Sequence, residues 1–184
     1  ISWFVLREAC TTVARLRRSC PDLAVSVNLG ARQLTDSRLL PRVRQALAAA
    51  ELDAAALTVE VTETETADEG AGRALAALRA AGVRVSLDDF GTGWSSLHRL
   101  TRLPVDEIKV DRSFVAGVGE DRGCDAVIGA LASMADELGL RLVAEGVEEP
   151  RQRDRLLELG CRTGQGWLYG GPVDAEALNA RLCR

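Results

Sequence analysis

The chain is expected to fold as an α/β protein with a parallel sheet. Six short β-favouring segments alternate with helical segments along its 184 residues, and this alternation is typical of parallel strands joined by right-handed crossovers. A glycine stands between a helix and the next strand at Gly82, Gly139 and Gly160. A helix C-terminus favours glycine because the residue there is often left-handed, so these glycines indicate where three helices end.

Hydrophobic periodicity predicts the individual elements. Helices are predicted over 1–19, 36–51 and 67–81, among others. The apolar stripe of the first helix is expected to contain Phe4, Leu6, Ala9, Cys10, Val13 and Leu16. Strands are predicted over 24–29, 57–62, 83–88, 105–110, 141–145 and 161–167. The last strand has the weakest pattern because it contains two glycines.

Composition excludes several classes of function. A net charge of −4 with dispersed arginines argues against a nucleic-acid footprint or a membrane-surface patch. No apolar run approaches the roughly 20 residues of a membrane helix. Five cysteines without C-x-x-C spacing and a single histidine match no zinc pattern. An odd cysteine count without a signal peptide predicts a cytoplasmic setting, either as a separate protein or as the cytosolic part of a membrane-attached one.

Polar residues mark the carboxyl end of every predicted strand. They are Asn28, Glu60, Asp88 with Asp89, Lys109 with Asp111, Glu145 and Gln165. In a (β/α)8 barrel all strand ends converge on one mouth, whereas in an open sheet only the strands at the switch point meet a ligand. Six contributing strands therefore favour the barrel. Because such a barrel has eight strands and about 250 residues, about two strands are expected to be absent from this chain.

The segment from Asp88 to Gly93 carries the strongest sign of a site. Adjacent carboxylates at a strand end repel each other unless a cation lies between them. The alternative is an Asp-rich turn that caps the following helix. Gly91 and Gly93 lack the third glycine of a dinucleotide-binding fingerprint, so they predict a loop with glycine hinges beside the site.

Together these side chains predict a centre that hydrolyses a phosphodiester with two metal ions. Asn28, Glu60 and Asp88 would hold one cation, and Asp88 with Asp89 a second. Oxygen ligands without histidine favour Mg²⁺ or Mn²⁺. Lys109 is the only lysine among 23 basic residues, which suggests that this position needs an amine, to orient water or neutralise phosphoryl charge. Glu145 would be a metal ligand or the base that takes the proton; the alternative is an ordinary carboxylate in a turn. Gln165 would orient the water; the alternative is a structural role.

Six ordered motifs resemble the EAL domain family of cyclic di-GMP phosphodiesterases. They are Ser26-Val27-Asn28-Leu29, Val59-Glu60-Val61-Thr62-Glu63, Asp88-Asp89-Phe90-Gly91-Thr92-Gly93, Lys109-Val110-Asp111-Arg112-Ser113-Phe114, Ala144-Glu145-Gly146-Val147-Glu148 and Gln165-Gly166. The resemblance implies a modified (β/α)8 barrel with an antiparallel first strand. It also implies hydrolysis of cyclic di-GMP to the linear dinucleotide pGpG.

The resemblance extends the list of expected site residues. It supports the metal ligands and catalytic residues given above, and it makes Glu63 the anchor of the loop after Asp89. Substrate contacts are expected from Gln33, Ser95, Asp111 and Glu148. Domains of this family usually dimerise, and they often follow sensory or diguanylate cyclase (GGDEF) domains.

One part of the family pattern has no counterpart here. The Glu-Ala-Leu sequence on the family's second strand is missing, because Ile1 to Cys10 already resembles the helix that follows it. The chain is therefore expected to be an N-terminally incomplete EAL domain over residues 1–184, from which the first two strands of the barrel are absent. By itself it is expected to bind metal poorly and to turn over slowly or not at all. A non-catalytic cyclic di-GMP receptor or protein-interaction domain is the alternative. A Schiff-base enzyme using Lys109 is disfavoured because nearby carboxylates would raise the pKa of the lysine.

Overall fold

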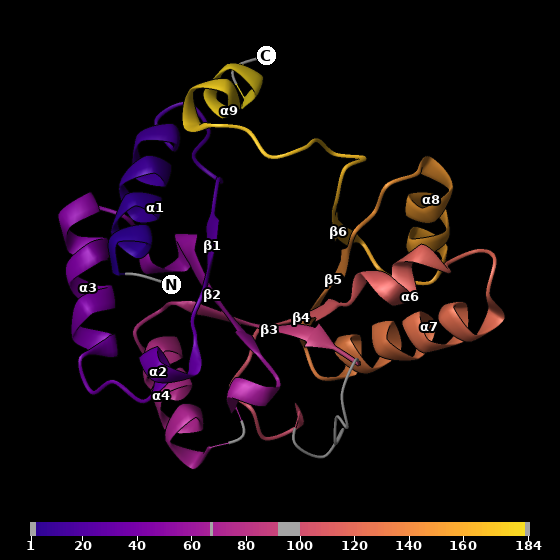
Figure 1. The fold of residues 1–184 in the computed structure, drawn as a ribbon, viewed down its shortest axis with the longest axis horizontal. Coiled ribbons are helices and arrows are strands. Elements are labelled where there is room, and N and C mark those ends of the chain that lie inside the picture. The colour runs from indigo at the N-terminus through magenta and orange to yellow at the C-terminus, as the bar shows by residue number, and fades with distance from the viewer. Residues whose placement is uncertain (1–2, 67, 92–99, 183–184) are drawn as a thin grey trace. The chain divides into compact units, whose positions relative to one another are not determined.

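The structure, a computed structural model, describes residues 3–66, 68–91 and 100–182 (Figure 1). Two compact units make up the chain. The first comprises Ile1–Val85 with Pro172–Arg184, and the second comprises Ser86–Gly171.

The first unit contains two parallel strands and most of the helices of the N-terminal half. Its elements are α1 (Trp3–Leu16), β1 (Val25–Asn28), α2 (Ala31–Leu34), α3 (Leu39–Ala50), β2 (Leu57–Thr62), α4 (Glu69–Ala80) and α9 (Ala175–Leu182), with short 3₁₀ turns at Ala54–Ala56 and Thr64–Thr66. The register of β1 and β2 sets Asn28 opposite Glu60. Helix α1 packs against α3 and β1 (Figure 1).

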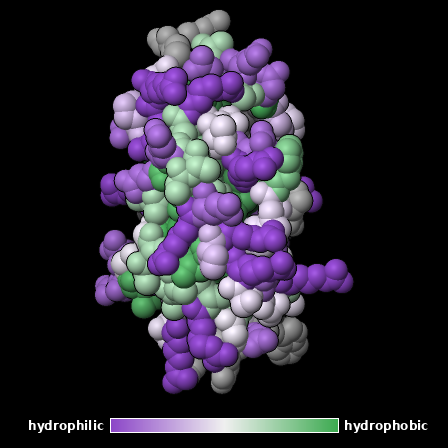
Figure 2. All heavy atoms as spheres, turned by 90° about the vertical axis from the view of Figure 1, so that its left-hand side faces the viewer, coloured by the Kyte–Doolittle hydropathy of each residue, from purple (hydrophilic) through white to green (hydrophobic). Residues whose placement is uncertain are grey.

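Helix α1 is amphipathic, but one predicted core residue lies on the wrong face. Its buried residues are Leu6, Cys10, Val13 and Leu16. Phe4 is 60% exposed, so its predicted place in the apolar stripe is wrong. Phe4 precedes Leu6 by two residues, which correspond to a rotation of about 200° around the helix axis. Its side chain therefore lies on the side opposite the buried face. The face that carries α1 and α3 is seen in Figure 2, where hydrophobic residues gather between hydrophilic ones.

The second unit is a parallel sheet with helices packed against it. Strand β3 (Arg84–Phe90) enters this unit at Ser86 and is followed by β4 (Glu107–Val110), α6 (Arg112–Ala116), α7 (Arg122–Glu137), β5 (Arg141–Glu145), α8 (Pro150–Glu158) and β6 (Thr163–Gln165). Strand β4 pairs with β3 and β5, and β5 pairs with β6, all in parallel. Helices α6 and α7 contact β5 (Figure 1). The carboxyl ends of these four strands therefore lie at the same edge of the sheet.

In the part of the chain that the structure describes, the prediction of six strands is confirmed, and the parallel pairings within each unit agree with the predicted α/β class. The predicted role of the three glycines is also confirmed, because Gly82, Gly139 and Gly160 have φ angles of 87°, 66° and 92°. Within the described residues, no helix is both long enough and apolar enough to cross a membrane.

The core of the second unit gives a first testable prediction. Ile108 is fully buried in β4, between β3 and β5. Replacing it with alanine leaves a cavity, so Ile108→Ala should lower the free energy of unfolding by about 2–5 kcal/mol, measured by urea denaturation. Leu138→Ala is the control, because Leu138 is 39% exposed and its loss should change stability by only about 0.5 kcal/mol. Equal losses in the two variants would contradict this description of the core.

Candidate active site

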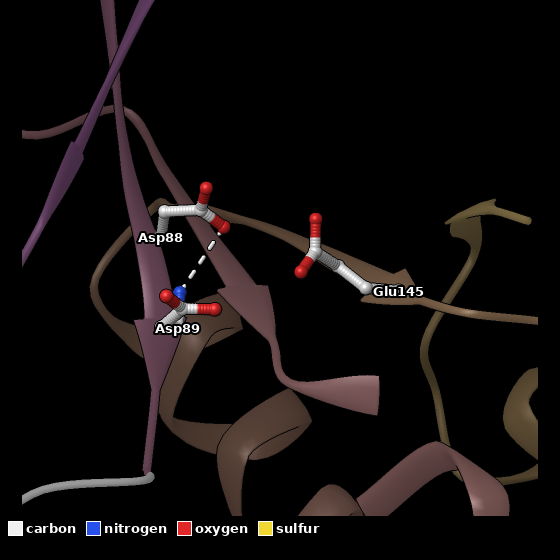
Figure 3. A group of neighbouring side chains, drawn as sticks. All are labelled: Asp88, Asp89 and Glu145. Carbon is white, nitrogen blue, oxygen red and sulfur yellow. Dashed lines mark hydrogen bonds between the residues drawn. The ribbon is translucent and has the colours of Figure 1, made fainter. Parts of the chain in front are cut away.

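A bulge in β3 determines how the two adjacent aspartates are presented. Leu87 pairs with Ile108 and Phe90 with Val110, so β3 has one residue more than β4 between these pairs. Asp89 has a φ of 55°, in the left-handed region that residues other than glycine seldom adopt. Neighbouring side chains of a regular strand point to opposite faces, whereas a bulge redirects them. Figure 3 shows the carboxyl groups of Asp88 and Asp89 near each other and facing Glu145.

These three carboxylates form a group that could bind a metal. Asp88, Asp89 and Glu145 each offer an oxygen within 4.8 Å of those of the other two. The backbone N–H of Asp89 donates to Asp88 Oδ1 at 3.1 Å (Figure 3). Hard divalent cations prefer carboxylate oxygens, so this set of donors fits Mg²⁺ or Mn²⁺ better than it fits zinc.

The amine of Lys109 lies between two of the carboxylates. Its Nζ is 3.1 Å from Asp88 Oδ1 and 2.5 Å from Glu145 Oε1. The lysine is 3% exposed although it carries an ammonium group. Gln165, the register partner of Glu145 on β6, donates from Nε2 to Glu145 Oε1 at 2.6 Å. The structure therefore brings together Asp88, Asp89, Lys109, Glu145 and Gln165, one or two from each of the four strands.

The electrostatics of Asp89 indicate a site that favours a cation. Partial burial raises the pKa of the Asp89 carboxyl, the charges of Asp88 and Asp111 raise it further, and Lys109 opposes them. A carboxyl with a raised pKa is destabilised in its ionised form. A divalent cation beside the group would relieve this cost.

The predicted site residues of the first unit have well-defined local positions. Glu60 is 7% exposed in β2, which agrees with the expectation that it is no surface residue, whereas Asn28 is exposed at the end of β1. Gln33 is buried and its Oε1 accepts a hydrogen bond from the backbone N–H of Gly30 at 3.2 Å. The carbonyl of Glu63 accepts a hydrogen bond from the Thr66 hydroxyl at 2.7 Å. The functional roles of these four residues stay predictions.

Comparison with known proteins identifies the family. The EAL domain model matches residues 1–172. This chain belongs to the EAL domain family. It is 41% identical, over 99% of its length, to the bifunctional diguanylate cyclase/cyclic di-GMP phosphodiesterase MucR of Pseudomonas aeruginosa, and it covers 27% of that protein. The chain thus spans about a quarter of the length of the curated relatives it matches first.

Solved structures support the same assignment. The c-di-GMP complex of the PaMucR phosphodiesterase matches with a TM-score of 0.89 and 40% identity, over 96% of this chain and 72% of that one. The manganese/c-di-GMP complex of Klebsiella pneumoniae BlrP1 matches with a TM-score of 0.79 and 31% identity, over 90% of this chain and 44% of that one. The predicted fold class, the modified (β/α)8 barrel of EAL domains, is thereby confirmed.

Three further residues were predicted to contact substrate in this EAL domain. Asp111 caps α6, because its Oδ1 accepts hydrogen bonds from the backbone N–H of Ser113 at 2.9 Å and from the Ser113 hydroxyl at 2.5 Å. Burial acts to raise the pKa of Asp111, but the bonds from Ser113 outweigh it and the pKa is lowered. Glu148 is exposed in the loop after β5, and Ser95 lies outside the described residues. Substrate contact stays a prediction for all three.

Sequence reasoning missed two features of this EAL domain. The bulge at Asp88 and Asp89 has no local signal, because a strand's register depends on its neighbour. Gln152, buried in α8, was missed because its bond to the carbonyl of Val115 reaches a residue distant in the sequence. The Glu149-to-Gln152 spacing of a capping box was the one signal that could have drawn attention to it.

The raised pKa of Asp89 predicts how stability depends on pH. A carboxyl group whose pKa is higher in the folded protein than in the unfolded chain stabilises the fold at low pH. This stabilisation is lost as the pH rises from the unfolded-state pKa through the folded-state pKa. In EDTA at pH 7, Asp89→Asn should therefore unfold at higher urea than the wild type. Below about pH 3, where aspartate is protonated in both the folded and the unfolded state, the difference should vanish.

Asp22→Asn, in an exposed turn of the first unit, is the control for this comparison, and it should match the wild type at both pH values. A destabilised Asp89→Asn variant at pH 7 would refute the electrostatic description of the site.

Proposed function

We propose that this chain carries the catalytic residues of a metal-dependent phosphodiesterase that hydrolyses cyclic di-GMP to linear pGpG in bacterial second-messenger signalling. The observation that supports this most directly is the group of three carboxylates, Asp88, Asp89 and Glu145, beside the buried amine of Lys109. MucR and NbdA of Pseudomonas aeruginosa, both 41% identical to this chain, carry phosphodiesterase names.

The proposed cofactor is a pair of Mg²⁺ or Mn²⁺ ions. Asp88, Asp89 and Glu145 would hold them, and Asn28 and Glu60 are proposed as further ligands because they match the family motifs. Such ions would polarise the phosphodiester and lower the pKa of water. Complexes of BlrP1 with calcium and with manganese support a divalent cation in the family.

The chain's own residues would then position the reacting groups. Lys109 Nζ is held between Asp88 and Glu145, where its N–H groups can orient water or stabilise charge on a phosphoryl oxygen. Glu145 Oε1 accepts from both Lys109 and Gln165, which fixes the orientation of this carboxylate for its role as a ligand or proton acceptor. Gln165 therefore acts on the reaction through Glu145 and through the water that it is proposed to contact.

We also propose the setting in which the domain works. A homodimer and a sensory or GGDEF domain in the same protein agree with the family, and MucR is named as both cyclase and phosphodiesterase. A cytoplasmic location agrees with the cysteines, since all four that the structure describes are free thiols.

The test is an assay of this chain with cyclic di-GMP and Mn²⁺ or Mg²⁺, with products separated by liquid chromatography. Formation of pGpG that EDTA abolishes is expected, at a low rate for this chain by itself. Glu145→Gln should lower kcat by at least about 100-fold, because the variant lacks the charge that binds metal or takes a proton. Glu158→Gln, on the exposed side of α8, should leave kcat unchanged.

The other outcomes separate the competing functions. Binding of cyclic di-GMP without hydrolysis, under both metals, would favour the non-catalytic receptor. Neither binding nor hydrolysis would contradict the proposal.

A further inference from the structure

We propose that Gln152 is a positioning residue that locks the β5–α8 loop, Gly146–Glu149, and thereby holds Glu145 and Gln165 in register beside Lys109. The inference rests on the proposed function and adds a residue that touches neither substrate nor metal. Gln152 is 6% exposed, and burial of an amide side chain is costly unless its polar atoms are paired.

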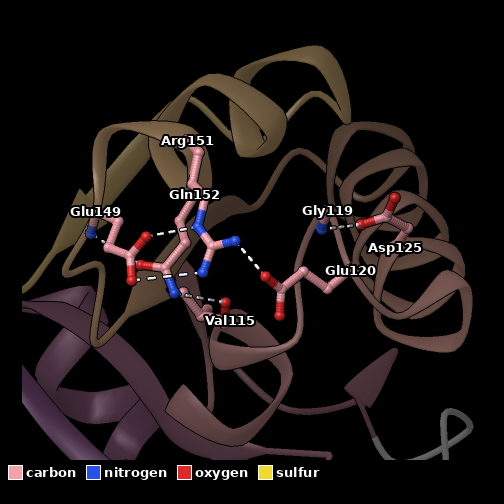
Figure 4. Close-up of polar contacts among 7 residues, drawn as sticks. All are labelled: Val115, Gly119, Glu120, Asp125, Glu149, Arg151 and Gln152. Carbon is pink, nitrogen blue, oxygen red and sulfur yellow. Dashed lines mark hydrogen bonds and ion pairs between the residues drawn. The ribbon is translucent and has the colours of Figure 1, made fainter.

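The side chain of Gln152 joins three segments of the second unit. Its Oε1 accepts hydrogen bonds from the backbone N–H groups of Glu148 at 2.8 Å and Glu149 at 3.0 Å. Its Nε2 donates to the carbonyl of Val115 at 3.3 Å, 37 residues away in the chain. Figure 4 shows the glutamine side chain extending from α8 toward Val115 of α6.

A capping box is the ordinary explanation for a glutamine at this position. Glu149 is the N-cap of α8 and Gln152 is its third residue, so a bond to the N–H of Glu149 is expected for the helix alone. The bonds to Glu148 and to Val115 go beyond that motif. They tie the loop after β5 to α6, the helix that follows β4 and Lys109 directly.

The rest of the β5–α8 loop is held by backbone contacts. Val147 donates to the carbonyl of Gln165 and accepts from the N–H of Leu168, both at 3.0 Å. Gly146 has a φ of 70°, and a Cβ on it would lie 2.7 Å from the Cβ of Arg112, so the loop packs closely against the start of α6. The loop is thus fixed against β6 by Val147 and against α6 by Gly146 and Gln152.

The loop is connected to the active site by the chain at Glu145 and by the hydrogen bonds of Gln165. Glu145 directly precedes the loop, and Gln165 offers its carbonyl to the loop and its side chain to Glu145. Without the acceptor of Gln152, the amides of Glu148 and Glu149 would lose their partner inside the protein and would depend on water for a hydrogen bond. The loop would then shift to find water, and Glu145 would move with it relative to Lys109.

The experiment compares Gln152→Met with Arg151→Met by Mn²⁺ titration calorimetry and by kinetics with cyclic di-GMP. Gln152→Met keeps the length of the side chain but removes its hydrogen bonds. It should weaken Mn²⁺ binding by about 10–100-fold, as loss of a group that orients a ligand does, and lower kcat with little change in KM. Arg151 is the matched control, because it neighbours Gln152 in α8 and joins Glu149 to Glu120, in the turn after α6, through exposed ion pairs (Figure 4). Its variant should behave as the wild type.

A second variant separates positioning from packing. Gln152→Glu keeps an acceptor for both loop amides and should recover most of the Mn²⁺ affinity that Gln152→Met loses. Wild-type affinity in a folded Gln152→Met protein, or equal losses in Gln152→Met and Arg151→Met, would overturn the inference.

Hydrogen exchange of the metal-free wild type decides the case even if Gln152→Met does not fold. The amides of Glu148 and Glu149 should exchange about 100-fold or more slowly than in an unstructured peptide, since both are bonded to a buried acceptor. Unprotected amides would refute the locking of the loop. If the wild type binds Mn²⁺ but does not hydrolyse cyclic di-GMP, this result would contradict the proposed enzymatic function and leave the inference about Gln152 standing. Mn²⁺ affinity and hydrogen exchange would still test the role of Gln152.

Discussion

The geometry of the site depends on one buried amine among carboxylates. Lys109 is almost fully enclosed and pairs with Asp88 on one neighbouring strand and Glu145 on the other. A buried ammonium is stable only when it is paired, and clustered carboxylates are stable only near a positive charge. Each side of this contact therefore needs the other, and the contact holds the carboxyl ends of β3, β4 and β5 in the arrangement that a divalent cation could enter.

A second constraint is the local backbone that presents the aspartates. The left-handed conformation of Asp89 costs of order 1 kcal/mol or more for a residue with a side chain. Partial burial, together with the charges of Asp88 and Asp111, also raises the pKa of its carboxyl. Both features lower stability in the metal-free protein, and the backbone conformation turns the two carboxylates toward one point. The site thus combines strain and repulsion in the region where a bound cation would compensate for them.

Much of this arrangement could be predicted from the sequence. The six strands and three helix-ending glycines follow from periodicity and from the conformational preference of glycine, both of which act over a few residues. The convergence of Asp88, Lys109, Glu145 and Gln165 followed from the topology of parallel strands. The bulge at Asp89 could not be predicted, because it is defined by pairing with β4. The hydrogen bond from Gln152 to Val115 could not be predicted either, because it joins residues that are distant in the sequence. The error at Phe4 arose because the residue was assigned to the buried face for being apolar, without regard to its angular position around the helix.

The most direct test of the central contact is the stability of Lys109→Met in EDTA at pH 7, measured by urea denaturation. Removing one partner of a buried ion pair should lower the free energy of unfolding by about 3–5 kcal/mol. Saturating Mn²⁺ should reduce this loss, because the cation would neutralise the carboxylates that Lys109 leaves behind. A variant as stable as the wild type in EDTA would show that the amine does not hold the carboxylates together, and it would contradict the account.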